Sequence, residues 1–186
     1  PREAGLIGAV GQLGMRKGLD VLLAAAEEVI PQFPELHLLL VGERNSAKNE
    51  AVKFEQRLRA SAAAPPLAGR VHFLGYRDDM PQLLNELTLL VHAARQEPLG
   101  RVLLEAAASG TPIIATDVGG TREILGDNQG AIVPPADSPL LAEKITALLN
   151  APDVRNTQAV AARDSVKMRF DIRQSAAELL RHYRAL

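Results

Sequence analysis

Cysteine is absent from the 186 residues of the chain, which excludes disulfide bonds and metal sites built on thiolates. Positive charge is not in excess either. The formal net charge is −1, so the chain lacks the basic surface expected of a nucleic-acid-binding protein. No apolar run approaches the roughly 20 residues of a membrane span, and the first residues do not resemble a signal peptide. We therefore expect a cytoplasmic protein with no nucleic-acid partner.

The composition is typical of a globular α/β core. Hydrophobic residues make up 47% of the chain and charged residues 23%, which argues against disorder. The length fits one domain, or one half of a two-domain enzyme. An apolar strand begins only four residues into the chain, as expected for a domain cut from a longer protein.

Short apolar runs alternate along the chain with segments of helical periodicity. The predicted strands span residues 5–10, 36–41, 71–74, 88–91, 112–116 and 131–133. The predicted helices span residues 19–30, 49–63, 80–86, 101–109, 139–150, 153–168 and 172–185. This alternation predicts an α/β fold with a Rossmann-like, doubly wound parallel sheet of about six strands. Ser138 is predicted to cap the helix that follows it.

Two glutamates bracket the start of the helix predicted over residues 101–109. Glu97 precedes the helix and Glu105 lies inside it, a step of roughly 12 Å if most of it is helical. The free N–H groups from Leu99 to Val102 form a site for anions and polar oxygens. A carboxylate can accept hydrogen bonds from a vicinal diol such as ribose. One segment can thus hold a sugar at one end and a ribose at the other, although two such glutamates can also be solvated surface charge.

Three motifs follow one another here: EPLGRVLLEA at residues 97–106, SGTPIIAT at 109–116 and GGTREI at 119–124. Together they resemble the signature of the retaining glycosyltransferase family 4. The resemblance covers nearly the whole chain, but only as the C-terminal, donor-binding half of such an enzyme. It implies a GT-B fold, a nucleoside-diphosphate sugar as donor, an N-terminal domain as partner, and neither cofactor nor metal. Residues 1–186 would then be one donor-binding domain of a hexosyltransferase for polysaccharide biosynthesis.

The resemblance also implies roles for single residues. Glu105 is expected to hold the ribose. Glu97 is expected to hold the sugar hydroxyls and to act near the anomeric carbon, which makes it a catalytic candidate. The backbone of Leu99, Gly100 and Val102 would bind phosphate oxygens.

The loop after the first strand, from Gly11 to Gly18, is the expected diphosphate site. The family has an arginine and a lysine here, and Lys17 matches the lysine as the second catalytic candidate. Gln12 stands where the family has its arginine, and a neutral contact to phosphate is about half as strong as a charged one. Whether Arg16 or Arg101 compensates, or donor binding is weak, stays open.

The segment Gly75-Tyr76-Arg77 matches the place where the family's backbone meets the base. The backbone of Arg77 would then contact the base, and its side chain is expected to be free. The pair Asp78-Asp79 is expected to cap the next helix rather than to bind a metal. Residues 42–45 replace the family's usual Gly-x-Gly turn.

Several polar residues receive no assigned role. His92 follows the fourth predicted strand close to the first glutamate and is left unassigned, whereas His37, His72 and His182 show no partner in the sequence. Glu123, in the third motif, is either a helix-start carboxylate or a site residue.

Two other readings remain open. A non-catalytic nucleotide-sugar-binding module is compatible with Gln12, and a sugar-nucleotide epimerase has the same fold, although the pattern of Glu97 and Glu105 argues against it. The glycines at positions 8, 11 and 14 do not form a GxGxxG fingerprint, which disfavours a dehydrogenase.

The terminal segment, residues 171–186, is expected to pack on the missing N-terminal domain. In the isolated chain this predicts exposed apolar side chains on the last helix. They are Ala176, Leu179, Leu180 and Tyr183. A peripheral association of the full enzyme with a membrane is compatible with this resemblance.

Overall fold

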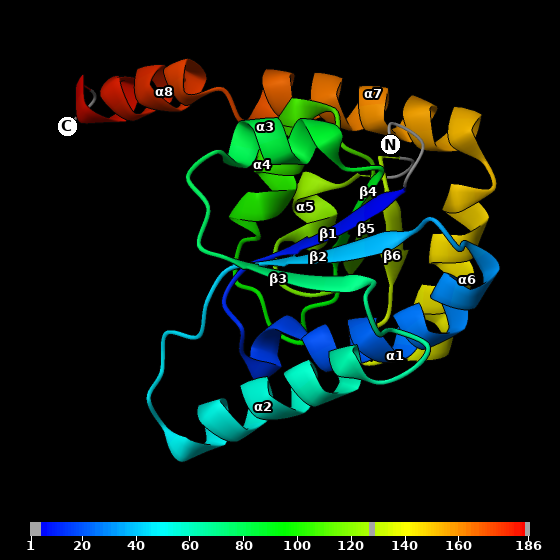
Figure 1. The fold of residues 1–186 in the computed structure, drawn as a ribbon. Helices are drawn as coiled ribbons and strands as arrows, with labels where there is room; N and C mark the ends of the chain where they lie inside the picture. Colours follow the sequence, from blue (N-terminus) through cyan, green and yellow to red (C-terminus); the bar gives the residue numbers. More distant parts are fainter. Residues whose placement is uncertain (1–4, 127–128, 185–186) are drawn as a thin grey trace.

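A computed structural model describes residues 5–126 and 129–184 of the chain (Figure 1). Six parallel strands form one sheet in the order β3-β2-β1-β4-β5-β6. The strands are β1 (Leu6–Val10), β2 (His37–Val41), β3 (Val71–Gly75), β4 (Leu89–His92), β5 (Ile113–Thr116) and β6 (Ala131–Val133). The predicted fold class is confirmed.

Helices cover both faces of the sheet (Figure 1). Helices α1 (Leu19–Val29), α2 (Asn49–Ala63) and α6 (Ser138–Leu149) pack on one face. Helices α3 (Met80–Glu86), α4 (Arg101–Ser109), α5 (Thr121–Ile124) and α7 (Pro152–Arg169) pack on the other. Two short 3₁₀ turns, η1 (Met15–Lys17) and η2 (Ile30–Gln32), flank α1, and α8 (Ile172–Arg184) follows α7.

The strands are continuous apolar runs in the sequence because each strand contributes side chains to the hydrophobic cores on both faces of the sheet. In β2, Leu38 and Leu40 belong to the cluster under α1 and α2, whereas Val41 belongs to the cluster under α3 and α4. Side chains that alternate along a strand point to opposite faces, so a sheet covered on both sides needs apolar residues at every position. This burial keeps the strand ends, and the loops that follow them, in fixed positions.

The order in which strands are added to the sheet reverses between β1 and β4. From β1 the chain adds β2 and then β3 on one side, and it returns to place β4 on the other side of β1. Open α/β sheets bind ligands at such a switch point, beyond the carboxyl ends of the strands. The loop after β1 carries Lys17, and the loop after β4 carries Glu97.

Helix α8 extends away from the body (Figure 1). None of its side chains is buried, and Leu179, Leu180 and Tyr183 are 57%, 54% and 67% exposed. The predicted exposure of this apolar surface, Ala176 included, is confirmed. The predicted last helical residue, Ala185, lies outside the described residues. Within the described ranges, no helix combines the length and apolar character that crossing a membrane requires.

Two local predictions are wrong. Ser138 is the first residue of α6 rather than its cap, because the Asp137 carboxylate accepts the Leu140 N–H at 3.0 Å. His37 and His72 do have a partner, since their ring atoms Nδ1 and Nε2 lie 2.9 Å apart across β2 and β3. Both errors concern side-chain partners, which hydrophobic periodicity does not report.

Candidate functional site

Hydrogen bonds fasten the loop after β1 to the loop after β4. The backbone N–H groups of Arg95 and Gln96 donate to the Arg16 carbonyl at 2.8 and 3.2 Å. The Arg95 guanidinium donates to both Asp20 carboxylate oxygens, at 2.7 and 2.8 Å, and to the Met15 carbonyl at 3.0 Å. These hydrogen bonds of Arg95 and Gln96 form a clamp that places the turn η1 directly beside the segment that leads into α4.

Gly18 permits this close approach of the two loops. Its backbone has φ = 61°, a left-handed conformation that favours glycine. A Cβ atom here would lie 1.9 Å from the carbonyl oxygen of Ala93, just beyond β4. The glycine of the Lys17-Gly18 pair is therefore required by packing.

The clamp brings the two catalytic candidates into contact. The Lys17 ammonium donates to Oε2 of Glu97 in a partly buried salt bridge, and the Gly100 N–H at the start of α4 donates to Oε1 at 3.3 Å. Burial alone would raise the pKa of Glu97, but the hydrogen bond and charge of Lys17 outweigh it and lower the pKa. Glu97 is thus an ionised acceptor at neutral pH.

His92 lies directly behind this salt bridge. It is the last residue of β4 rather than the loop residue expected from the sequence, and its side chain is 3% exposed. Its Nε2 lies 3.4 Å from Oε2 of Glu97, yet neither ring nitrogen makes a well-formed hydrogen bond within the described part of the chain. Burial, followed by the charge of Lys17, lowers the pKa of His92, so the ring is neutral near pH 7. Sequence reasoning missed this placement, and only the nearness to Glu97 pointed to it.

The motif Gly119-Gly120 packs against the same glutamate segment. A Cβ on Gly119, whose φ is 50°, would lie 1.7 Å from the carbonyl oxygen of Glu97, and one on Gly120 would lie 3.0 Å from that of Leu99. The glycines of the third motif therefore allow its backbone to pack closely against residues 97–99 of the first motif. Next to it, the buried Thr121 hydroxyl has no hydrogen-bond partner among the described residues.

A hollow of about 280 Å³ opens between the ends of β1, β2 and β3. Its lining includes residues expected near the phosphates, Gly11 and Gln12, and near the base, Tyr76 and Arg77. It also includes residues that the sequence did not assign to the phosphates or the base: Gly42, Glu43, Asn45 and Met80. The Tyr76 N–H donates to the Glu43 carboxylate at 3.3 Å, while the Tyr76 side chain is 77% exposed. A base entering here would meet one backbone donor that already has an acceptor.

Two expectations about this hollow are wrong. The Arg77 side chain is not free, because its Nε donates to Oδ1 of Asp79 at 2.8 Å. Asp79 occupies the N-cap position of α3, yet its carboxylate makes no capping hydrogen bond. The Arg77 hydrogen bond instead lowers the pKa of Asp79. An arginine two residues away competes successfully with the helix N–H groups.

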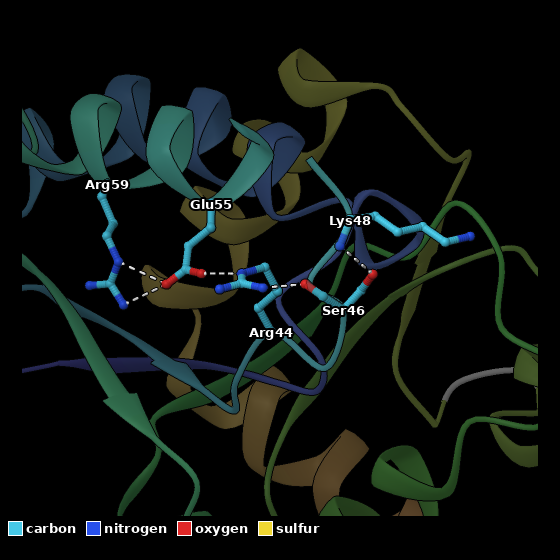
Figure 2. A network of polar contacts seen from close by, with 5 residues as sticks. All are labelled: Arg44, Ser46, Lys48, Glu55 and Arg59. Carbon is cyan, nitrogen blue, oxygen red and sulfur yellow. Dashed lines mark hydrogen bonds and ion pairs between the residues drawn. The ribbon is translucent and has the colours of Figure 1, made fainter. Parts of the chain in front are cut away.

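The loop after β2 is fastened to α2 by the network in Figure 2. Arg44 donates from Nε to Oε2 of Glu55 at 2.8 Å and also donates to the Ser46 carbonyl. Arg59 donates from Nε and Nη2 to Oε1 of Glu55 at 3.0 and 2.9 Å. The Lys48 N–H donates to the Ser46 hydroxyl at 3.3 Å. The loop that has no Gly-x-Gly turn at residues 42–45 is thus held to α2 by side chains.

Glu105, the second glutamate of the first motif, has different surroundings from Glu97. The Glu105 side chain is 43% exposed and lies 3.4 Å from Arg101, itself 82% exposed. It borders a hollow of about 680 Å³ that α4 shares with the end of α7 and the start of α8. Leu99, just before α4, is exposed, and Val102 in its first turn is half-buried. Across the described ranges, no three His, Asp or Glu side chains cluster as metal ligands.

The strand order and the loops that meet at the switch point are those of a Rossmann-like domain of the GT-B class. The family model described as glycosyl transferases group 1 matches residues 4–151, and the chain belongs to this family. The family resemblance inferred from the three motifs is thereby confirmed.

Individual relatives agree with this assignment. The phosphatidyl-myo-inositol mannosyltransferase of Mycobacterium leprae is 34% identical over 172 residues, which cover 90% of this chain and 43% of that protein. The crystal structure of Anabaena HepE in complex with UDP-glucose is similar, with a TM-score of 0.90 and 27% identity over 99% of this chain and 50% of that one. A C-terminal domain of the group 1 glycosyltransferase LpcC from Francisella tularensis has a TM-score of 0.82 at 26% identity, over 90% of this chain and 87% of that one. The chain spans about half the length of the full-length relatives.

Proposed function

We propose that this chain is the donor-binding half of a retaining hexosyltransferase, which moves a sugar from a nucleoside diphosphate to an acceptor hydroxyl. The observation that carries the proposal is the contact between Lys17 and Glu97 at the switch-point crevice. It joins a cation suited to a diphosphate to an acceptor suited to sugar hydroxyls. The UDP-glucose bound to the similar HepE supports the same class of ligand.

Departure of the diphosphate is the step in which charge develops. The leaving group gains negative charge as the bond to the anomeric carbon breaks, and preorganised donors lower the barrier. Lys17 supplies the cation, and the N–H groups of Leu99, Arg101 and Val102 at the start of α4 add a partial positive charge, whereas the Gly100 N–H is held by Glu97. Gln12 lines the neighbouring hollow and supplies a neutral amide to the phosphates.

The two glutamates divide the remaining contacts. Glu97 is ionised, and it accepts hydrogen bonds from the sugar hydroxyls close to the anomeric carbon. Glu105, the fifth residue of α4, holds the ribose. The base lies against the backbone of Arg77, across the hollow at the ends of β1 to β3. Neither a metal nor a cofactor takes part in this scheme.

The acceptor site belongs to an N-terminal domain that this chain does not include. The exposed apolar face of α8 with Leu179, Leu180 and Tyr183 would pack on that domain. The Mycobacterium leprae relative is named a phosphatidyl-myo-inositol mannosyltransferase. The phosphatidyl group in that name supports a peripheral membrane association of the whole protein. The cytoplasmic location of the donor half is part of the same proposal.

Calorimetry with UDP, GDP and ADP tests the donor site directly. One of these nucleotides should bind, and Lys17→Gln should weaken its binding roughly tenfold or more, the value of one charged hydrogen bond. Lys144→Gln is the matched control, because Lys144 is an exposed lysine on α6. Failure of the folded chain to bind any of the three would contradict the proposal. Sugar transfer by this chain alone would contradict the division of labour.

Gln12 favours a second candidate, a non-catalytic nucleotide-sugar-binding module. The loss of one cation weakens stabilisation of the leaving diphosphate more than it weakens ground-state binding. Gln12→Arg separates the two candidates in the full-length protein. If the protein is an enzyme that tolerates a neutral contact, the substitution should raise nucleotide affinity and leave or increase turnover. A module would bind more tightly and still show no release of UDP or GDP from the donor.

A further inference from the structure

His92 has an unusual position for a histidine with a merely structural role. Its ring is buried at the end of β4, and it lines a crevice of only about 10 Å³ together with Gly11 and Lys17. Buried polar atoms in folded proteins nearly always have hydrogen-bond partners. Both ring nitrogens of His92 lack a well-formed one among the residues that the structure describes. The ring therefore retains an unused hydrogen-bonding capacity inside the candidate site.

Glu97 is the potential hydrogen-bond partner next to this ring. The ring atom Nε2 lies 3.4 Å from Oε2, which is the same oxygen that accepts the Lys17 ammonium. The second carboxylate oxygen, Oε1, is held by the Gly100 N–H. Nε2 of His92 is thus a second nitrogen close to Oε2, although it does not yet form a hydrogen bond with it.

The Lys17 ammonium has two alternative anionic partners. In the absence of a sugar nucleotide it pairs with Glu97, and in the proposed function it pairs with the diphosphate. Once the ammonium turns toward the phosphates, Oε2 of Glu97 loses its closest partner in a partly buried place. A small approach and realignment of Nε2 would convert the 3.4 Å contact into an ordinary hydrogen bond.

We propose that His92 is a positioning residue that takes over Oε2 of Glu97 when a diphosphate draws Lys17 away. The inference rests on the proposed function, since it assumes that Glu97 contacts the donor sugar. The neutral ring donates its Nε2 proton, so the carboxylate stays ionised and keeps its orientation toward the sugar. Burial and the charge of Lys17 hold the pKa of His92 below its ordinary value, which preserves the neutral form.

Three variants of His92 separate a positioning role from packing. In His92→Gln the side-chain amide nitrogen reaches about as far as Nε2, so a donor toward Glu97 is kept. In His92→Asn the amide reaches only as far as Nδ1, and His92→Leu has no donor. Calorimetry compares UDP-glucose with UDP, and GDP-mannose with GDP, because the sugar contributes only to the first member of each pair.

Loss of the Nε2 donor should weaken binding of the sugar nucleotide roughly tenfold. Binding of the nucleotide alone should change less than about threefold, because Lys17 and the start of α4 are intact. His92→Gln should restore most of the lost affinity. Where His92→Leu does not fold, the pair His92→Gln and His92→Asn carries the same comparison.

Glu97→Gln keeps the two proposals apart. If it leaves the preference for the sugar nucleotide unchanged, the sugar-binding role of Glu97 is wrong and the role of His92 fails with it. If Glu97→Gln removes the preference while all three His92 variants keep it, only the inference about His92 is wrong. Equal weakening of nucleotide and sugar nucleotide by His92→Asn, without rescue by His92→Gln, would show that His92 acts through packing.

Discussion

Two polar networks hold the loops at the carboxyl edge of the sheet. The outer network in Figure 2 joins Arg44, after β2, to Glu55 and Arg59 on α2, and each carboxylate oxygen of Glu55 accepts from a guanidinium. The inner network joins Lys17, Glu97 and His92 at the crevice between β1 and β4. Both attach a loop to a neighbouring element through a glutamate.

The two networks differ in how completely their members are bonded. In the outer network Arg59 also stacks over the Phe73 ring at 4.3 Å, so its guanidinium serves both the carboxylate and the sheet. In the inner network the buried ring of His92 lacks a well-formed hydrogen bond among the described residues. A complete network is what stability alone requires, whereas an incomplete one in a crevice is typical of a site that awaits a ligand.

The largest effect is expected where the inner network is forced apart. Gly18→Ala would place a Cβ atom 1.9 Å from the Ala93 carbonyl oxygen, at a positive φ. The free energy of unfolding should fall by roughly 2–4 kcal/mol, as for other strained or overpacked substitutions. Urea unfolding measures this. Gly14→Ala is the matched control, since no atom lies within 4 Å of its Cβ position, and equal losses for both variants would contradict the packing account.

A smaller effect is expected from opening the clamp that supports the inner network. Arg95→Gln removes the paired hydrogen bonds to Asp20 and the bond to the Met15 carbonyl, all partly exposed. Stability should fall by about 1 kcal/mol, and UDP or GDP affinity by severalfold, because Lys17 loses its support.

Arg59→Gln is the control for this clamp variant. It removes a comparable arginine from the outer network and should lower stability without changing nucleotide affinity. A loss of affinity in both variants would remove the functional distinction between the two networks.

Acidification should reveal the buried histidine of the inner network. The pKa of His92 in the folded chain lies below its ordinary value of 6.5, first because of burial and then because of Lys17. Just below that pH the unfolded chain binds more protons than the folded one, so stability falls as the pH decreases. The difference in unfolding free energy between wild type and His92→Gln, measured from pH 7 to pH 5.5, should isolate the contribution of His92 protonation to this pH dependence. Parallel pH profiles would show that His92 does not titrate differently in the folded state.

The smallest effect is expected in the outer network. Glu55→Gln should cost less than about 1 kcal/mol at neutral pH, because partly exposed ion pairs are screened by water and salt. The hydrogen bonds from Arg44 and then Arg59 lower the pKa of Glu55, so its stabilisation is present above the ordinary value of 4.5 and is lost as the pH falls through the lower folded value. Unfolding in low and high salt measures the effect. A loss that salt does not reduce would argue against an electrostatic origin.

The sequence by itself was sufficient for the parallel sheet, the helices and the loops that carry the candidate residues. Apolar runs mark strands buried on both faces, and this pattern depends only on neighbours along the chain. The alternation of strands and helices then implies that the loops after β1 and β4 lie at the same carboxyl edge. The motifs in those loops identify Lys17 and Glu97 as candidates without any knowledge of their contact.

Only the tertiary structure decided which polar groups meet. Lys17 and Glu97 are 80 residues apart in the chain, and the Arg95 clamp and His92 become meaningful only when β1 and β4 lie side by side. The choice of Asp79 as the partner of Arg77, and of Asp137 as the cap of α6, likewise depends on local distances. Burial follows a periodic pattern, whereas a hydrogen bond depends on differences of a few tenths of an ångström that no such pattern records.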